Sequence, residues 1–561
     1  MSAPVDIQVA PRLPWRPEDT RRACRGRVLL RLRDLRDHVP HGSDVALGAL
    51  TAALRLDVPA VDRAISARSA AMRVTRPYFA ARNLSTVGRR HLGWADDELD
   101  LGLARTFRVD LDPDTSIVDL VQSLSELDAV ESASPVYLAD CPFSADHGPG
   151  ARGDSSARRA HSPGEPEFTE FTDLTEFTDL DDWAHLAVRA SAALAQEPGD
   201  PTIIIAIIDS GVATDHPELR GRCRAGADLV DLPESDISRG IHLLGDYSRR
   251  DNLPHDEIGH GTACAGILGA RGLSLPPGMA GASPLLPMRA LAAAKVADRP
   301  RPTALGTLSD IDVAVKLAVD LGARVCNLSF GTPESALRVS DPVPHAEIVE
   351  YALGRGCVLV AASGNSGDAT RYFPAALPGV IAVAAVGRDL RPALFSTRGD
   401  HVLIAAPGQH IRCAGLTGET AHNGTSFAAP FVAGAAALVL AAAARRLVPL
   451  SPFEVRDILV RTSQPFAGAP GEHHGSGAGI LDAAAAVAAA RALRPVDLAD
   501  HGDFGDLGEA PAPPSPPNPL ARDLQLTATP ATSTMGLETE TVGKRPVASH
   551  LGRGADRPQL I

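Results

Sequence analysis

The sequence predicts an α/β fold, a mostly parallel sheet with helices on both faces, and three observations support it. Between residues 183 and 490 the strand-like runs are continuously apolar, as expected of strands buried on both faces. Segments with helical spacing lie between several of these runs. The 561 residues are 44% hydrophobic and 22% charged, which suits a sizeable globular core. The strand-like runs are Thr202–Asp209, Pro284–Leu291, Ala323–Phe330, Cys357–Ser363, Gly379–Val386 and His401–Gly408.

Helices are expected in the same region, and a smaller α+β region precedes it. The helical candidates between the apolar runs include Ser309–Gly322 and His345–Gly356. Residues 1–141 mix strands and a helix, Ser116–Leu127, in which Ser116 is the expected N-cap and the apolar residues follow the helical spacing. The strands predicted there are Gly26–Leu35, Thr106–Pro113 and Val130–Ala139.

Two segments have the composition of flexible spacers. Residues 142–182 are rich in Gly, Ser, Pro and Arg and then become acidic, with a short repeat at 170–181. We interpret them as a solvated linker, with a specific docking segment as the alternative. Residues 491–561 contain a proline-rich run at 509–519 and no periodic segment, so they predict a disordered tail.

The net charge, the cysteine spacing and the apolar runs limit the classes of function that this protein can have. The net charge of −14 argues against nucleic acid as the main partner. The seven cysteines are scattered without a C-x-x-C pair, so neither a zinc site nor a disulfide framework follows from their spacing. The first thirty residues lack the apolar run of a secretory signal, and Phe427–Ala444 is interpreted as a buried helix. We therefore expect a cytoplasmic protein with no membrane partner.

Three reactive residues lie where predicted strands end or helices begin. Asp209 ends an isoleucine-rich strand, His260 lies in GHGTACAG, and Ser426 lies in NGTSFAAP. In open α/β sheets, reactive residues collect at such places. A turn aspartate, a lone histidine or a serine at a helix start is a weak signal by itself. Their conjunction, in the order Asp, His, Ser and each among small residues, is a much stronger one.

These residues resemble the subtilisin-like serine protease family, the subtilases, which share this chain order. The resemblance covers most of residues 183–490 and implies a subtilisin-like catalytic domain that acts as a serine endopeptidase, a hydrolase, on peptide or protein substrates. The segments that carry it are Ile207–Leu219, Gly259–Gly266, Leu328–Gly331, Ala361–Gly367, Tyr372–Gly387, Ala393–Gly399, Gly424–Pro430 and Gly475–Val487.

The resemblance implies a role for each site residue. Ser426 would attack the peptide carbonyl, His260 would accept the serine proton, and Asp209 would fix the histidine tautomer. Asn365 matches the oxyanion asparagine of the family, and the resulting acyl-enzyme would be hydrolysed by water. The two stretches that would flank a bound peptide contain Leu328, Ser329, Phe330 and Gly331 on one side, and Ala362, Ser363 and Gly364 on the other.

The amino-terminal region resembles an inhibitor of the same family. The strand–helix–strand pattern of residues 106–139 is similar to the end of the family's prodomain, which implies a self-inhibited zymogen processed within residues 142–182. Residues 1–105 match weakly and could instead form an unrelated interaction domain. Asp181–Ala195 looks like the family's mature amino-terminal segment.

The chemistry implied by the resemblance requires no cofactor. Calcium sites are common in the family, but the carboxylates of the Cys223–Glu257 insertion lack EF-hand spacing, so no metal is predicted. Cys264 should lie one helical turn from His260, where it would make the site thiol-sensitive or serve as a small buried residue. Two other functions stay open: a dedicated intracellular processing protease for one precursor or partner, and a non-catalytic binding module on a protease fold.

Overall fold

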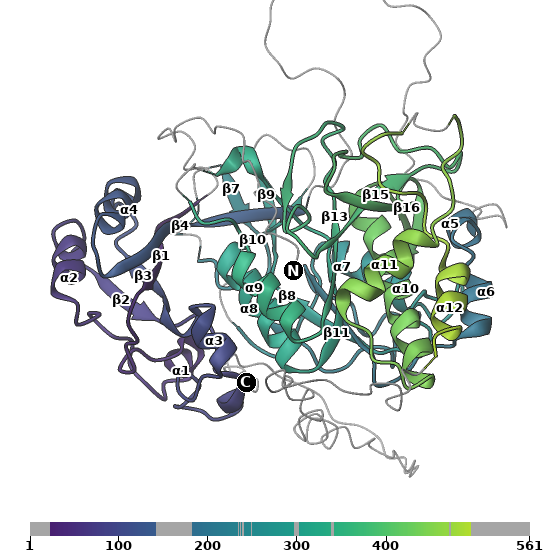
Figure 1. Ribbon diagram of the computed structural model, residues 1–561. Helices are drawn as coiled ribbons and strands as arrows, with labels where there is room; N and C mark the ends of the chain where they lie inside the picture. The colour runs from purple at the N-terminus through teal and green to yellow at the C-terminus, as the bar shows by residue number, and fades with distance from the viewer. Residues whose placement is uncertain are drawn as a thin grey trace, which may run out of the picture.

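The computed structural model describes residues 23–141 and 182–494, apart from 234, 236, 238–239, 248–249, 297–301, 338–340 and 470–472. Nearly all of the predicted linker (142–182) and the predicted tail from residue 495 onward therefore lie outside the described residues. Figure 1 shows the amino-terminal region, coloured purple to blue, beside a larger region coloured teal to yellow.

A seven-stranded sheet lies at the centre of the larger region, with the strand order β16-β15-β13-β11-β5-β8-β6. Each neighbouring pair in this sheet is parallel, as predicted from the continuous apolar runs. The strands are β5 (Ile204–Asp209), β6 (Ala227–Asp228), β8 (Leu285–Arg289), β11 (Ala323–Leu328), β13 (Val358–Ala362), β15 (Ile381–Val386) and β16 (Val402–Pro407).

Helices cover both faces of this sheet, and β5 shows how one strand serves two cores. Ile205 and Ile207 pack into one hydrophobic core, while Ile204 and Ile208 pack into the other, because successive side chains of a strand point to opposite faces. The first core contains α5 (Trp183–Ala187), α6 (Ala190–Gln196), α7 (His260–Gly269), α10 (Thr425–Arg445), α11 (Pro452–Arg461) and α12 (Ala483–Arg491). The second contains α8 (Leu308–Asp320) and α9 (Ala346–Gly354).

Helix α10 is long and apolar enough to cross a membrane by length and composition alone. However, 94% of its most apolar 18-residue window is buried inside the molecule. A helix that is apolar all round belongs in the core of a large domain when protein surrounds it. The structure thus confirms the buried helix predicted at Phe427–Ala444.

A second seven-stranded sheet, in the order β2-β3-β1-β4-β10-β9-β7, combines four strands of the amino-terminal region with β10, β9 and β7 of the larger region. Helices α2 (Pro59–Ser66) and α4 (Ile117–Ser125) pack against it through Val61, Ile65 and Leu120. Its strands are β1 (Ala23–Leu32), β2 (Met72–Thr75), β3 (Thr106–Leu111), β4 (Val130–Cys141), β7 (Ile241–Leu243), β9 (Ala292–Val296) and β10 (Thr303–Thr307). The remaining short α-helices and strands are α1 (Gly42–Ala46), α3 (Asp96–Asp100), β12 (Thr332–Pro333), β14 (Tyr372–Phe373), β17 (Ile411–Ala414) and β18 (Glu419–His422).

Strand β4 joins the two regions, and Figure 1 shows it running from the amino-terminal region toward β10. Up to Tyr137 it pairs antiparallel with β1, and from Leu138 to Cys141 it pairs antiparallel with β10. Strand β1 lies between β3 and β4. Residues 23–105 therefore share one sheet with residues 106–141.

Candidate active site

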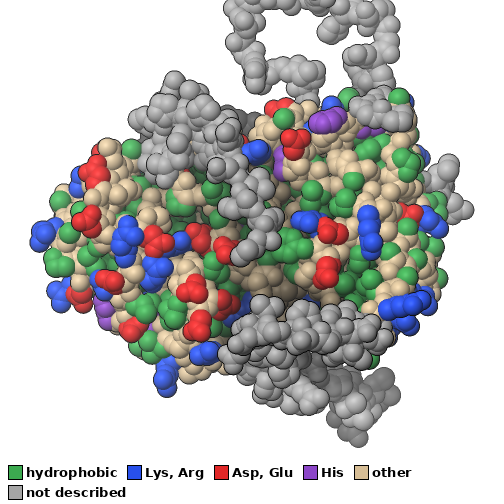
Figure 2. Space-filling model, viewed as in Figure 1, with side chains coloured by type: hydrophobic (Ala, Val, Ile, Leu, Met, Phe, Trp, Pro, Cys, Tyr) green, Lys and Arg blue, Asp and Glu red, His purple; other side chains and the backbone are tan. Residues whose placement is uncertain are grey.

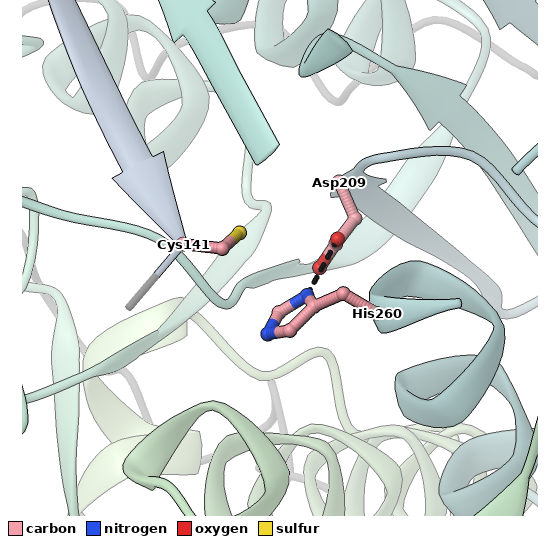
Figure 3. A group of neighbouring side chains, drawn as sticks. All are labelled: Cys141, Asp209 and His260. Carbon is pink, nitrogen blue, oxygen red and sulfur yellow. Dashed lines mark hydrogen bonds and ion pairs between the residues drawn. The ribbon is translucent and has the colours of Figure 1, made fainter. Parts of the chain in front are cut away.

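Asp209 and His260 form a buried hydrogen-bonded pair at the carboxyl end of β5. The distance from His260 Nδ1 to Asp209 Oδ1 is 2.7 Å, and neither side chain is exposed to solvent. The same carboxylate oxygen accepts the backbone N–H of Ser210 at 2.7 Å. Figure 3 shows the histidine ring and the carboxylate pointing toward each other.

The residue after the histidine allows α7 to approach β5. A side-chain carbon placed on Gly261 would lie 2.1 Å from the carbonyl oxygen of Gly211 and 3.1 Å from the Asp209 side chain. Since real contacts of that kind do not occur at 2.1 Å, only glycine lets the first turn of α7 come this close. The His-Gly pair in the sequence is thus a requirement of the geometry.

Asp256 fixes the start of α7, a function that sequence reasoning missed. Its Oδ1 accepts bonds from the Ser210 hydroxyl (3.0 Å) and from the backbone N–H groups of Ile258 and Gly259. Its Oδ2 accepts the N–H of Thr262 at 2.9 Å and the Thr262 hydroxyl at 2.6 Å. A carboxylate at a helix amino terminus is electrostatically favourable. The sequence signal for this role was an acidic residue four positions before His260, the first residue of the helix.

Ser426 is the second residue of α10, and its side chain faces the segment after β11. Its hydroxyl donates to the Ser329 carbonyl at 3.2 Å, and its own carbonyl accepts the Ser329 hydroxyl at 2.8 Å. The same Ser426 carbonyl accepts the Cys264 thiol at 3.5 Å. Burial raises the pKa of the Cys264 thiol well above its usual value, and Asp209 adds to the shift. Cys264 therefore stays a protonated, buried residue, the second of the two roles expected from the sequence.

Asn365 lies beside the amino terminus of α10. Its side-chain oxygen accepts both the backbone N–H and the hydroxyl of Thr425, each at 2.9 Å. These bonds orient the amide so that Nδ2 is its donor end, and that nitrogen would lie 3.5 Å from a side-chain carbon placed on Gly424. An N–H donor is thereby positioned next to the turn that carries Ser426.

The segments predicted to flank a peptide lie on both sides of this centre. Ser329 and Gly331 follow the end of β11, and Gly331 forms an antiparallel bridge with Asp140 of β4. Ala362 ends β13, and the backbone N–H of Gly364 donates to the Thr425 hydroxyl at 3.2 Å. Sequence reasoning did not predict strand β10, which pairs with Leu138–Cys141 of β4, because its TALGT sequence is short and lacks a marked periodicity.

Cys141, the last residue of β4, also reaches this centre. Its thiol donates to the Ser329 carbonyl at 3.4 Å, the same oxygen that accepts the Ser426 hydroxyl. Burial raises the pKa of the thiol well above its usual value, and the neighbouring Asp209 raises it further. The sequence predicted that the strand ends at Ala139, two residues earlier, so this contact could not be foreseen.

Comparisons with known proteins agree with this arrangement. Residues 200–479 match the model of the subtilase family. The chain is 38% identical over 269 residues to a thermophilic serine proteinase of Bacillus sp. (strain AK1), covering 47% of this chain and 57% of that protein. It is 35% identical to thermitase of Thermoactinomyces vulgaris (42% and 74%) and 31% identical to subtilisin BL of Lederbergia lenta (54% and 97%). The chain belongs to the subtilase family.

The first of these relatives is named as a serine proteinase, and that name describes the relative itself. The chain spans only 57% of the length of the AK1 proteinase. Among solved structures, it matches a protease from Pseudoalteromonas arctica PAMC 21717 with 26% identity and a TM-score of 0.45, covering 55% of this chain and 97% of that one.

Two carboxylates of the Cys223–Glu257 segment of this subtilase are paired with arginines. Asp228 pairs with Arg289 at 2.5 Å, and Asp231 pairs with Arg108 at 2.6 Å. Asp251 accepts a backbone N–H. Calcium requires six to eight oxygen ligands, and an arginine among them opposes a cation. Asp236 lies outside the described residues.

Proposed function

We propose that this subtilase cleaves peptide bonds as a serine endopeptidase through Asp209, His260 and Ser426, and that residues 23–141 inhibit it in the intact chain. The observation that carries the catalytic proposal is the buried 2.7 Å bond between His260 Nδ1 and Asp209 Oδ1. Because Nδ1 donates to Asp209, Nε2 is the nitrogen that can accept a proton. Substrates are peptides or proteins, the class cleaved by an endopeptidase.

The reaction would proceed through a covalent acyl-enzyme. Ser426 Oγ attacks the peptide carbonyl while His260 accepts its proton, and buried Asp209 stabilises the resulting imidazolium. The negative charge that develops on the carbonyl oxygen is bound by Asn365 Nδ2 and by the Ser426 backbone N–H. His260 then protonates the leaving amine, and water hydrolyses the ester at Ser426.

Strand β4 supports the inhibitory part of the proposal. A peptide that binds by strand addition needs the free edges of β10 and of the segment at Gly331. In the intact chain β4 pairs with both edges, through Leu138–Cys141 and through Asp140. The Ser426 hydroxyl, moreover, donates to Ser329, so its proton must turn away from that carbonyl before His260 can accept it. Cleavage within residues 142–182 would be the first step toward an open cleft.

The cysteines favour a reducing compartment for this protein. All seven lie in the described part of the chain, none forms a disulfide, and six of them are buried. Extracellular enzymes that lack a disulfide are common, but seven unpaired thiols are more typical of a reducing, cytoplasmic setting.

Mass spectrometry of the intact chain with a fluorophosphonate tests the proposal. We expect the wild-type chain to be cut between residues 142 and 182 and to gain an adduct on Ser426, whereas Ser426→Ala stays uncut and unlabelled. Asp209→Asn should slow peptide hydrolysis by about 10⁴-fold, since the wrong histidine tautomer is then held.

Two outcomes would contradict the proposal. If Ser426→Ala were cut as fast as wild type, the chain would not process itself. If wild-type protein still failed to react with the fluorophosphonate after its linker had been cut and residues 23–141 had been separated from it, a non-catalytic binding module would be favoured. Cleavage profiling on a denatured proteome then separates a general protease, which cuts many proteins, from a dedicated one.

A further inference from the structure

Three side chains that can bind a metal ion lie close together at the end of β4. Figure 3 shows the Cys141 thiol directed toward the Asp209–His260 pair. The Cys141 sulfur, a carboxylate oxygen of Asp209 and a ring nitrogen of His260 all lie within 4.8 Å of one another, and all three residues are buried. Thiolate, imidazole and carboxylate are the ligands that zinc prefers in proteins.

We propose that Cys141, Asp209 and His260 form a site for a zinc-like divalent cation while β4 occupies the cleft. A thiolate and a carboxylate bring two negative charges, which a dication neutralises, so the buried site as a whole carries no net charge. Calcium and magnesium prefer sets made only of oxygen ligands, and the sulfur therefore selects a softer metal.

The donors require only a small rearrangement to bind such an ion. Zinc bonds of about 2.3 Å to sulfur and about 2.0 Å to nitrogen or oxygen place neighbouring ligand atoms of a tetrahedron within about 4 Å of one another. The present spacing of up to 4.8 Å is therefore closed by a shift of roughly 1 Å at Cys141, the terminal residue of its strand. The thiol proton is released to solvent as the metal–sulfur bond forms. When Nδ1 of His260 is the ligand, its proton is replaced by one on Nε2, and water completes the coordination.

The consequence of binding rests on the proposed function. A metal-bound His260 can no longer accept the Ser426 proton, and a metal bridge from Cys141 ties the end of β4 to the catalytic pair. The ion would therefore hold the chain in its inhibited form, and its removal would precede activation. A reducing compartment would keep the Cys141 sulfur available as a ligand.

Cobalt titration of the full chain carrying Ser426→Ala tests the site, since this variant cannot cut itself. After chelator treatment, we expect saturable Co²⁺ binding with a thiolate-to-cobalt charge-transfer band, and displacement of the cobalt by Zn²⁺. Adding Cys141→Ser should abolish the band and weaken zinc binding at least about tenfold. Cys413→Ser is the matched control, because this buried thiol donates instead to the Ile411 carbonyl at 3.5 Å, and the band should persist.

A second variant keeps the test informative if Cys141→Ser disturbs folding. Cys141→His supplies another zinc ligand, so zinc should still raise the melting temperature while the sulfur band disappears. A band that persists in Cys141→Ser, or the lack of saturable metal binding by the folded Ser426→Ala chain, would overturn the proposal. These measurements need no catalysis, so the metal-binding proposal can fail while fluorophosphonate labelling of the wild type succeeds. Equally, metal binding can be observed while labelling fails.

Discussion

The carboxylate of Asp256 accepts five hydrogen bonds around the start of α7, and none of these five comes from His260. Asp256→Asn replaces one oxygen with a donor that opposes the Thr262 N–H and hydroxyl. We expect a loss of about 2 to 4 kcal/mol in the free energy of unfolding, from unsatisfied buried donors. We also expect kcat to fall more than KM changes, because the turn that orients His260 is loosened. Urea unfolding and steady-state kinetics measure both effects.

A nearby aspartate provides the control for Asp256. Asp251 is buried too, and its Oδ1 accepts the backbone N–H of Leu253 at 2.6 Å, a bond that does not reach α7, which begins at His260. Asp251→Asn should lower stability but leave kcat per folded molecule unchanged. An equal fall of kcat in both variants would show that Asp256 does not position the histidine.

At the scale of elements, the turn after α7 is held by one carboxylate, that of Glu218. Its oxygens accept the backbone N–H groups of Gly272, Leu273, Ser274 and Leu275. Burial by itself raises the pKa of Glu218, but these N–H bonds outweigh it and lower the pKa from 4.5 to about 2. The turn thus gains its stability from an ionised side chain.

A depressed pKa makes the stabilisation by Glu218 sensitive to acid. The unfolded chain takes up this proton near pH 4.5 and the folded chain only near pH 2, so the contribution is complete above pH 4.5 and is lost as pH falls toward 2. Glu218→Gln should be less stable than its parent at pH 7 and should lose less stability between pH 5 and pH 2. Denaturant unfolding in the Ser426→Ala background measures this, and parallel pH profiles would contradict it.

Elements differ in how well the sequence predicts them, and the reason is physical. Strands such as β5 and β13 are buried on both faces, so their continuous apolar runs are visible in the sequence. Strand β10 is short, and its partner β4 is remote in the chain, so only the folded molecule brings the two together. The position of Cys141 depends on that pairing register. Asp209, His260 and Ser426 could be singled out as candidates because each lies in a characteristic run of small residues, and at Gly261 the close approach of α7 to β5 requires glycine.

At the scale of the whole molecule, one buried ion pair and two partly buried ones connect residues 23–141 to the rest of the chain. Glu98 pairs with Lys316 at 2.6 Å, and neither side chain is exposed. Arg108 pairs with Asp231 at 2.6 Å, and Arg31 pairs with Glu347 at 2.7 Å. Figure 2 shows many further acidic and basic side chains interspersed on the surface of the amino-terminal region, at the left of the view. Salt screens the attraction between such exposed charges, whereas it screens the attraction within buried ion pairs much less.

We therefore expect residues 23–141 to stay bound after the linker is cut. In a Ser426→Ala chain cut by an unrelated protease, the two fragments should co-elute on size exclusion even in about 1 M NaCl, where exposed pairs are screened. Lys316→Ala leaves Glu98 buried without its cation and also removes the 2.7 Å pair with Asp320 of the same helix. The loss should cost about 3 to 5 kcal/mol, and the part that falls on Glu98 promotes separation of the fragments.

An exposed ion pair provides the control for this interface. Arg25 and Asp114 both belong to the amino-terminal region, and their side chains are 41% and 94% exposed. Arg25→Ala should leave the association of the two fragments unchanged. Separation of the unmodified fragments at high salt would contradict the prediction.

Strand β4 also determines how the molecule responds to heat. Because one strand completes the hydrogen-bond ladders of β1 and β10, melting either region removes a partner from the other. The intact chain should accordingly absorb heat in one cooperative transition, with a calorimetric enthalpy equal to the van't Hoff enthalpy. Backbone amides along β4 should exchange with deuterium only through global unfolding, so that this strand reports the stability of the entire protein.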